Sequence, residues 1–421
     1  NARYPITIDP WSQQAYLKAS NTDADDRFGI SVAISGDTIV VGATYEDSNS
    51  VVINAGQGNN AAADAGAAYV FVRSGSIWSQ QAYLKASNTD AVDRFGGSVA
   101  IFNNTVVVGA VNESSNSTTI NGGQSNNAAN YAGAAYVFER SGSSWSQQAY
   151  LKASNTDIND FFGLSVAVAG NTIAVGTAYE DSNSTVINGD QSNNSATNAG
   201  AVYVFERSGT SWSQQAYLKA SNTDAFDYFG YSVAIFDNTL LVGAFNEDSN
   251  STSIDGDQGN NAATNAGAAY VFERSGSSWS QQAYLKASNT NAYDYFGYSV
   301  AISGDTVVVA ARDEDSNSTG IDGDQGNNAA SASGAAYVFV RDSGNWSQQT
   351  YLKASNTGAD DNFGFSVAIS GDTAVIGATD EDSNSTIING DQGNNAASYA
   401  GAAYVFQVLQ DDVFKNGFEG T

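Results

Sequence analysis

The sequence predicts an all-β protein that folds as a six-bladed β-propeller of four-stranded antiparallel blades. A 67-residue unit is repeated six times without insertion or deletion, four strand-like segments recur in each unit, and no segment has helical periodicity. Units of this kind cannot bury their apolar faces alone and stack on their neighbours, so the repeats should form one body. The units begin at the six tryptophans, Trp11, Trp78, Trp145, Trp212, Trp279 and Trp346.

The first copy illustrates the four predicted strands. Residues 28–34 alternate in polarity, a turn at Gly36 follows, and residues 39–41 are continuously apolar. After a long polar loop, residues 65–75 predict a third strand and residues 77–87 a fourth. Four antiparallel strands in succession are typical of one propeller blade. A β-solenoid is the alternative architecture, but its coils are usually much shorter than this repeat.

The two ends of the chain predict how the ring closes. The chain begins with a fourth strand, Trp11–Ala19, and ends with a third strand, Ala402–Leu409, that has no fourth strand after it. Pairing of these strands would complete the last blade and remove two exposed sheet edges. The predicted organisation is therefore an N-terminal arm at 1–10, the propeller at 11–409 and a C-terminal tail at 410–421.

Composition excludes several classes of function. The chain has 44 acidic and 16 basic residues and a formal net charge of −28, so it should repel nucleic acid and anionic membranes. It contains no Cys, Met or His, which removes thiolate catalysis, the usual zinc ligands and His-based catalytic triads. No apolar run reaches the length of about 20 residues that spans a bilayer. Because the chain begins at Asn1 without a methionine, we expect a mature secreted, extracellular or cell-surface protein.

Residues 26–43 read DRFGISVAISGDTIVVGA and are followed by GAAYVF at residues 66–71. This pattern resembles the FG-GAP repeat, the blade motif of integrin α-subunit propellers and of many secreted bacterial proteins, and the bacterial form is the closer match. The resemblance implies a β-propeller and is specific for fold rather than for function. All six copies carry the Phe-Gly pair, at Phe28-Gly29, Phe95-Gly96, Phe162-Gly163, Phe229-Gly230, Phe296-Gly297 and Phe363-Gly364.

Two departures separate the chain from the integrin form of the repeat. The aspartate-rich calcium hairpin between the first two strands of integrin blades is replaced by tight turns such as SGDT, and the proline of the GAP motif is absent. Integrin propellers also have seven blades rather than six. Their calcium hairpin and their ligand-binding geometry are therefore not carried over to this chain.

Two polar connections should emerge on the same face of every blade, and together they form a candidate calcium site. One is the long loop after the second strand, residues 44–64 in the first copy, and the other precedes the next first strand. Calcium takes about six to eight oxygen ligands, which the recurring carboxylates and amides could supply. The alternative is that Asn and Asp cap their own turns, and that their recurrence records duplication. The candidate ligands are Asp26, Glu46, Asp47, Asn49, Asp93, Glu113, Asp160, Glu180, Asp181, Asp227, Glu247, Asp248, Asp294, Glu314, Asp315, Asp361, Glu381 and Asp382.

Aromatic residues around the Phe-Gly turn make the ring chemically lopsided. The first copy has Asp25, Arg27 and Ile30 where the fourth and fifth copies have aromatic side chains. Aromatics beside polar loops are typical of contact surfaces for a glycan or a protein. Position 30 and its equivalents are expected to face inward as core. The candidate partner-binding residues are Phe226, Tyr228, Tyr231, Tyr293, Tyr295 and Tyr298.

The sequence favours a non-catalytic binding or adhesion module that acts through its loop-covered face, with a protein or glycan partner at a cell surface. Calcium is the one cofactor considered, and no organic cofactor is expected. A structural subunit that self-assembles through its terminal arms into a filament or surface layer is the alternative. A glycan-active enzyme using paired carboxylates is less favoured, because few acids are unique to one copy.

Overall fold

The computed structural model describes residues 14–407, and every regular element in that range is a β-strand. The strands form six sheets, and in each sheet the strands pair antiparallel in chain order. No helix able to cross a membrane occurs within the described range.

The first three sheets contain β1 (Val32–Ser35), β2 (Thr38–Ala43), β3 (Ala67–Ser74) and β4 (Ile77–Leu84); β5 (Phe95–Phe102), β6 (Thr105–Ala110), β7 (Ala134–Ser141) and β8 (Ser144–Leu151); and β9 (Ser165–Ala169), β10 (Thr172–Thr177), β11 (Ala201–Ser208) and β12 (Ser211–Leu218). The other three contain β13 (Ser232–Phe236), β14 (Thr239–Ala244), β15 (Ala268–Ser275) and β16 (Ser278–Leu285); β17 (Phe296–Ser303), β18 (Thr306–Ala311), β19 (Ala335–Asp342) and β20 (Asn345–Leu352); and β21 (Phe363–Ser370), β22 (Thr373–Ala378) and β23 (Ala402–Gln407).

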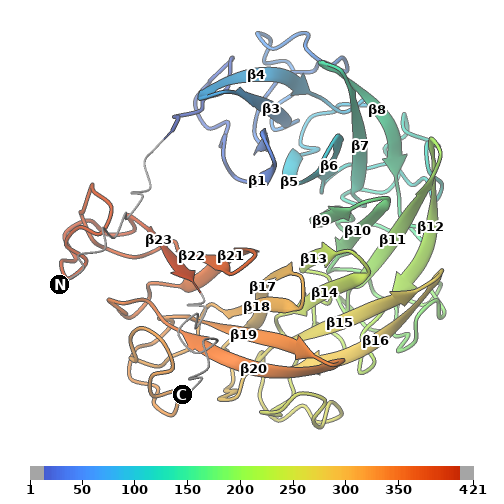
Figure 1. Cartoon of the computed structure of the whole chain (residues 1–421). Coiled ribbons are helices and arrows are strands. Elements are labelled where there is room, and N and C mark those ends of the chain that lie inside the picture. The colour runs from blue at the N-terminus through green and yellow to red at the C-terminus, as the bar shows by residue number, and fades with distance from the viewer. Residues whose placement is uncertain (1–13, 408–421) are drawn as a thin grey trace, which may run out of the picture.

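The six sheets are arranged as blades around a common centre, with the first strand of each blade innermost and the fourth outermost (Figure 1). This arrangement confirms the predicted six-bladed propeller. In every four-stranded blade the pairing of the third and fourth strands shifts at the same position, for example between Val204 and Phe205. Such a bulge increases the local twist of the outer strand.

The apolar core is divided among the interfaces between neighbouring blades. Between the second and third blades, Val107 and Leu151 of one blade pack with Phe162, Val175 and Tyr203 of the next, and all five side chains are fully buried. Equivalent clusters lie at the other interfaces between consecutive blades. Because each large apolar side chain contributes about 1.5 to 3 kcal/mol when buried, stacking of blades supplies the main stabilising term.

The Phe-Gly pair serves this stacking directly. The ring of Phe162 lies edge-on to that of Tyr203, with 5.5 Å between centroids. Gly163 has a φ of 91°, and a Cβ there would lie 2.4 Å from the carbonyl oxygen of Ala134. The aromatic side chain therefore fills the interface, while the glycine allows the backbones of two blades to approach closely.

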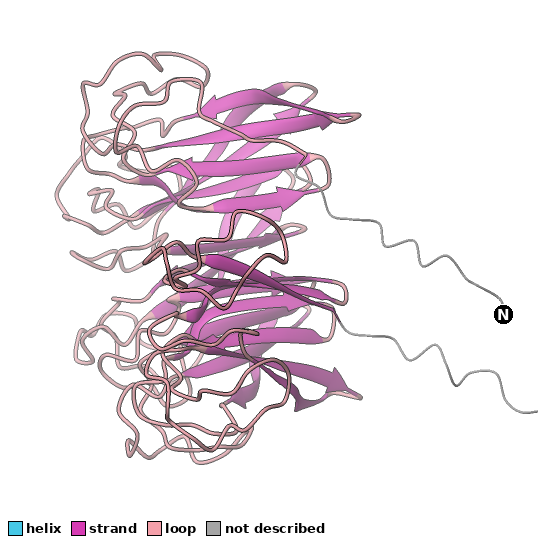
Figure 2. Ribbon diagram, turned by 90° about the vertical axis from the view of Figure 1, so that its left-hand side faces the viewer, coloured by secondary structure: helices cyan, strands magenta, loops and turns pink. Residues whose placement is uncertain are grey.

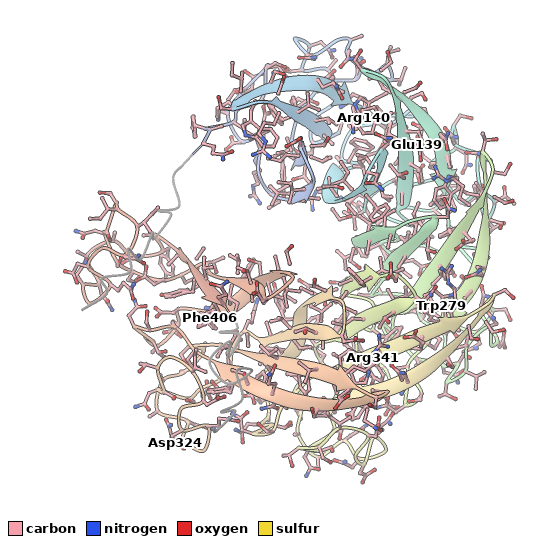
Figure 3. The ribbon with its side chains drawn as sticks, in the orientation of Figure 1. Glu139, Arg140, Trp279, Asp324, Arg341 and Phe406 are labelled. Atoms are coloured by element: carbon pink, nitrogen blue, oxygen red, sulfur yellow. The ribbon has the colours of Figure 1, made fainter. Side chains whose placement is uncertain are left out.

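On the face opposite the long loops, polar side chains link consecutive blades. The indole nitrogen of Trp279 donates to Gln215 Oε1 of the preceding blade at 2.8 Å. Arg274 lies over the ring of Trp279, 5.7 Å from its centroid. Arg341 of the next blade pairs with Glu273 at 2.9 Å, and Figure 3 labels Trp279 and Arg341 on these neighbouring blades.

The ring is open between its first and last blades (Figure 1). The last sheet has three strands, and β23 pairs with β22 alone. Residues 14–19, the described part of the predicted closing strand, adopt no strand, although Leu17 and Ala19 pack against Tyr69 of the first blade. The predicted pairing of the chain ends is thus not formed among the described residues. Residues 11–13 and 408–409, the arm at 1–10 and the tail at 410–421 lie outside them.

Candidate functional site

The long polar loops gather on one side of the ring, as the sequence predicts (Figure 2). Each loop is held by its own side chains. In the first copy Asn59 donates to Ser48 Oγ at 3.0 Å and accepts from the backbone N–H of Asn49 at 3.1 Å. The carboxylate of Asp47 accepts the N–H of Asp64 at 2.9 Å. The recurring Asn and Asp residues therefore cap turns, and this gives the loop face a fixed shape.

A buried ion pair anchors the base of each long loop in the first five blades. In the first blade Lys85 Nζ lies 3.0 Å from Glu46 Oε2 and also donates to the carbonyl oxygens of Ser48 and Gly66. Both side chains are almost completely buried. Burial lowers the pKa of Lys85, and the charge of Glu46 opposes that shift. The equivalent pairs are Lys152–Glu113, Lys219–Glu180, Lys286–Glu247 and Lys353–Glu314.

The remaining oxygen of the Glu46 carboxylate is also occupied. Glu46 Oε1 accepts from the Tyr83 hydroxyl at 2.7 Å and from the amide of Asn21 at 2.9 Å. Asn21 belongs to the connection that precedes the blade, so Glu46 joins the long loop, the outer strand and the incoming chain. The same Asn-to-Glu bond recurs in the other five copies.

The aspartates that precede the Phe-Gly pairs also have structural partners. Asp160 Oδ2 accepts the backbone N–H of Asp157 at 2.8 Å, and the same bond forms in every copy. Burial raises the pKa of Asp160, Asp227 and Asp294 to about 8, against the opposing effect of this backbone bond. Burial likewise raises the pKa of Asp93 to about 7. Each of these aspartates therefore holds the turn before its Phe-Gly pair.

These contacts do not fit the candidate calcium site. In the first five blades Glu46 and its equivalents pair with lysine, and in all six they accept an asparagine amide, while Asp47 and Asp26 cap turns. Across residues 14–407, no three acidic side chains meet in a group that could hold a metal ion. The capping alternative therefore accounts for the recurrence of these residues, and the calcium site stays a hypothesis without a donor set.

We expect the melting temperature to be the same in millimolar calcium and in EDTA, because the carboxylates are already paired. Differential scanning fluorimetry measures this directly, with magnesium as the control for a general effect of divalent ions on a chain of net charge −28. A bound ion at about 100 times its dissociation constant adds about 2.7 kcal/mol. A calcium-specific rise in melting temperature would therefore restore the metal hypothesis.

Aromatic rings form a continuous arc at the loop-side ends of the innermost strands. Tyr228 and Tyr231 both contact Phe245, with 5.3 and 4.4 Å between centroids. Tyr231 contacts Tyr298 of the next blade at 5.2 Å, and their hydroxyl oxygens lie 3.3 Å apart. Further contacts extend this aromatic arc in both directions. The aromatic arc is defined by Tyr131, Phe161, Tyr179, Tyr228, Tyr231, Phe245, Tyr295, Tyr298 and Phe365.

The structure thus brings together four of the six aromatic residues that the sequence selects. Tyr228, Tyr231, Tyr295 and Tyr298 are half-buried members of the arc. The other two, Phe226 and Tyr293, are 53% and 57% exposed. Position 30 was expected to face the core, but Ile30 and Phe365 are exposed and Tyr231 and Tyr298 are half-buried, so this position is not part of the core.

Sequence reasoning missed several members of the arc and its cation. Phe245 and Arg312 occupy the position of the absent GAP proline, and Tyr179 follows that position by one residue. Arg312 lies over Tyr298, 4.5 Å from the ring centroid, and pairs with Asp313 at 2.9 Å. Comparison of all repeat positions near the Phe-Gly turn would have found them, because these are positions where the copies differ most.

Six segments match the FG-GAP repeat family: residues 11–71, 78–138, 145–205, 212–272, 279–339 and 346–406. The chain belongs to the FG-GAP repeat family. No curated protein matches the chain. Among solved structures, the chain is similar to a putative 6-phosphogluconolactonase from Bacteroides uniformis ATCC 8492, with 9% identity, a TM-score of 0.44, and coverage of 83% of this chain and 77% of that one. That likeness carries no argument about function.

Proposed function

We propose that this FG-GAP propeller is a non-catalytic binding module of the extracellular space or cell surface, and that its contact surface is the aromatic arc on the loop face. FG-GAP repeats are typical of extracellular proteins, and FG-GAP propellers generally bind proteins. The partner is a protein or a glycan of that surface, and the role is adhesion.

One observation carries the proposal: at a few repeat positions near the Phe-Gly turn, neighbouring copies carry aromatic residues in place of arginine or small residues, and these aromatics meet in the arc. Position 27 is arginine in the first two blades, phenylalanine or tyrosine in the next three, and Asn362 in the last. Strand residues, loop caps and the buried lysine-glutamate pairs recur nearly unchanged. Stacking of blades requires none of these aromatics, because the first blade stacks on the second without them. Their concentration on one part of the ring is therefore better explained by contact with a partner.

The chemistry of the arc suits such contact. Tyrosines combine a large apolar face with a hydroxyl group and lose little conformational entropy on binding, and arginine adds a cation over aromatic faces. The recurring acids offer less for catalysis, because they are paired with lysine or used as caps. This pairing is what supports the non-catalytic reading.

The double variant Tyr228→Ser/Tyr295→Ser should bind its partner at least tenfold more weakly, while its melting temperature changes little. Truncating central aromatic contacts commonly costs 2 kcal/mol or more, and about 1.4 kcal/mol is a factor of ten in affinity. Binding would be measured on immobilised oligosaccharides and on whole cells. The matched control is Phe236→Ser, which removes a partly exposed aromatic from the end of β13, away from the arc.

Two results would contradict the proposal. One is unchanged binding by the double variant, and the other is an absence of binding by the unsubstituted protein to both surfaces. Equal weakening by Phe236→Ser would show that the effect is not specific to the loop face.

Self-assembly into a filament or surface layer is the second candidate, and one observation favours it. The first and last blades present unpaired apolar faces, including Val32 and Val405. A second copy could cover these faces through a head-to-tail contact. Size-exclusion chromatography with electron microscopy distinguishes a monomeric binder from such a polymer.

A further inference from the structure

Arginine-glutamate ion pairs link consecutive blades in the middle of the chain. In each pair the glutamate lies near the end of the third strand of one blade, and the arginine lies one position further along the repeat in the next blade. The pairs are Glu139–Arg207, Glu206–Arg274 and Glu273–Arg341. One repeat before Arg207 is Arg140, but the residue one repeat before Glu139 is Val72. No acidic side chain within residues 14–407 forms an ion pair with Arg140. The first and second blades are therefore joined without the carboxylate that these three interfaces contain.

The pair between the third and fourth blades shows what surrounds such a carboxylate. Glu206 Oε2 accepts from Arg274 Nη1 at 2.6 Å and from the hydroxyl group of Thr172 at 2.8 Å. Arg274 also donates from Nη1 to Thr172 Oγ1 at 2.8 Å and from Nε to Asn238 Oδ1 at 3.0 Å. A threonine and an arginine thus direct their donors toward one carboxylate, and an asparagine holds the arginine in place.

Arg140 is held by the same partners, but valine replaces the glutamate. Its Nη1 donates to Thr38 Oγ1 at 3.0 Å and its Nε to Asn104 Oδ1 at 2.9 Å, so the side chain reaches the first blade (Figure 3). Val72 opposes Thr38 in the pairing of β2 with β3, the register in which the third blade pairs its glutamate with the equivalent threonine. Thr38 is 3% exposed, and its hydroxyl group donates to no acceptor within residues 14–407. Two donors therefore lie together at a position where the third blade has a carboxylate and the first blade has an apolar side chain.

A cavity of about 570 Å³ lies at this position and is lined, among others, by Val72, Arg140, Arg73 and Asp37. Arg73 pairs with Asp37 at 2.5 Å, which leaves the charge of Arg140 without a counterion among the lining residues. The equivalent cavity between the fourth and fifth blades is about 270 Å³, contains Glu273, and is lined by three acidic residues and one arginine. Small-molecule sites usually have volumes of about 300 to 1,000 Å³. The larger cavity therefore combines the size of a ligand site with a positive charge, and the smaller one has neither.

We propose that this cavity binds a small hydroxylated carboxylic acid, of the uronic acid class, whose carboxylate takes the place of the missing glutamate beside Arg140 and Thr38. Charge-assisted hydrogen bonds from a guanidinium group to a carboxylate are stronger than bonds between neutral groups. Gln81 and Asn103 also line the cavity, and their amide groups suit the hydroxyl groups of a sugar. The net charge of −28 repels a large polyanion, so the ligand is a small acid. The cavity lies at the β1–β2 turn, at the opposite end of β2 from the long loop, so it is separate from the aromatic arc.

Isothermal titration calorimetry at low ionic strength tests the site with galacturonate and with galactose, which has a hydroxymethyl group in place of the carboxylate. Galacturonate should bind one equivalent and galactose at least about tenfold more weakly, because a hydrogen bond to a charged group is worth roughly a factor of ten or more. Val72→Glu should weaken galacturonate binding by a similar factor, because its own carboxylate would occupy the position. The matched control is Val340→Glu, the same substitution in the fifth blade, which should leave binding unchanged. No binding of galacturonate, equal binding of galactose, or full binding by Val72→Glu would each overturn the proposal.

A second readout needs no added ligand. Val72→Glu should raise the melting temperature by pairing with Arg140, and the rise should vanish when Arg140→Met is combined with it. Because three other blades carry glutamate at this position, the variant is compatible with the fold. An unchanged melting temperature, or a rise that persists in the double variant, would show that no carboxylate position lies beside Arg140 and would overturn the site. Neither measurement involves the aromatic arc, so this site and the proposed function can fail separately.

Discussion

Replacing Lys219 with methionine is expected to lower the free energy of unfolding by about 3 to 5 kcal/mol, the cost of leaving one partner of a buried ion pair alone. Lys219 Nζ lies 3.1 Å from Glu180 Oε2 and donates to the carbonyl oxygens of Ser182 and Gly200 at 2.7 and 2.6 Å. Methionine has a similar length but no donor, so a carboxylate and two carbonyl groups would lose their partner inside the blade. Urea denaturation at neutral pH measures the loss.

Two controls separate the buried charge from general effects of the substitution. The double variant Lys219→Met/Glu180→Gln removes the uncompensated charge and should recover part of the lost stability. Arg73→Met breaks the exposed pair with Asp37, which should cost no more than about 1 kcal/mol because solvent screens such pairs. Equal losses for Lys219→Met and Arg73→Met would contradict the structural role of the buried pair.

The fold was predictable because repetition and alternation are both local in the sequence. The strand positions followed from apolar periodicity, and the number of blades followed from the tryptophan spacing. The first strand is less regular than expected: β1 begins at Val32 rather than at Phe28, and where the first strand does begin at the phenylalanine, as in β5, its pairing shifts between Phe95 and Ser98. Whether the ring is closed between its first and last blades could not be predicted from the repeat pattern, because closure depends on how a strand near one end of the chain meets a sheet near the other end.

The buried pairs were only half predictable. Glu46 was selected from the sequence because a glutamate recurs at this position in every copy, and its carboxylate oxygens suggested a metal ligand. Its partner Lys85 is 39 residues away and lies at the end of an outer strand, so no local pattern joins the two. One signal was nevertheless present: a lysine recurs between Leu84 and Ala86 in an otherwise apolar stretch. A charged residue that recurs in such a position indicates a buried ion pair as readily as it indicates a side chain exposed to solvent.

Gly200→Ala is expected to cost more stability than an alanine substitution at any turn glycine of the same blade. Gly200 has a φ of 82°, and an added Cβ would lie 2.1 Å from the carbonyl oxygen and 2.6 Å from the backbone nitrogen of Phe229. Since both neighbours are backbone atoms of the next blade, the clash can be relieved only by moving the blades apart. The unfavourable φ costs about 1 to 2 kcal/mol and overpacking about 1 to 3 kcal/mol more.

Gly209→Ala supplies the matched comparison, because Gly209 has a φ of 63° and nothing within 4 Å of an added Cβ. It carries the conformational cost without the clash, so the difference between the two variants isolates the contact between blades. We expect urea denaturation to place Gly200→Ala about 1 to 3 kcal/mol below Gly209→Ala. Equal costs would mean that blades tolerate a wider spacing, and the Phe-Gly pair would then owe its recurrence to turn geometry rather than to stacking. The expected difference would instead show that the six blades stack only where their backbones can approach closely. Lys219 supports this approach, because its Nζ donates to the carbonyl oxygen of Gly200.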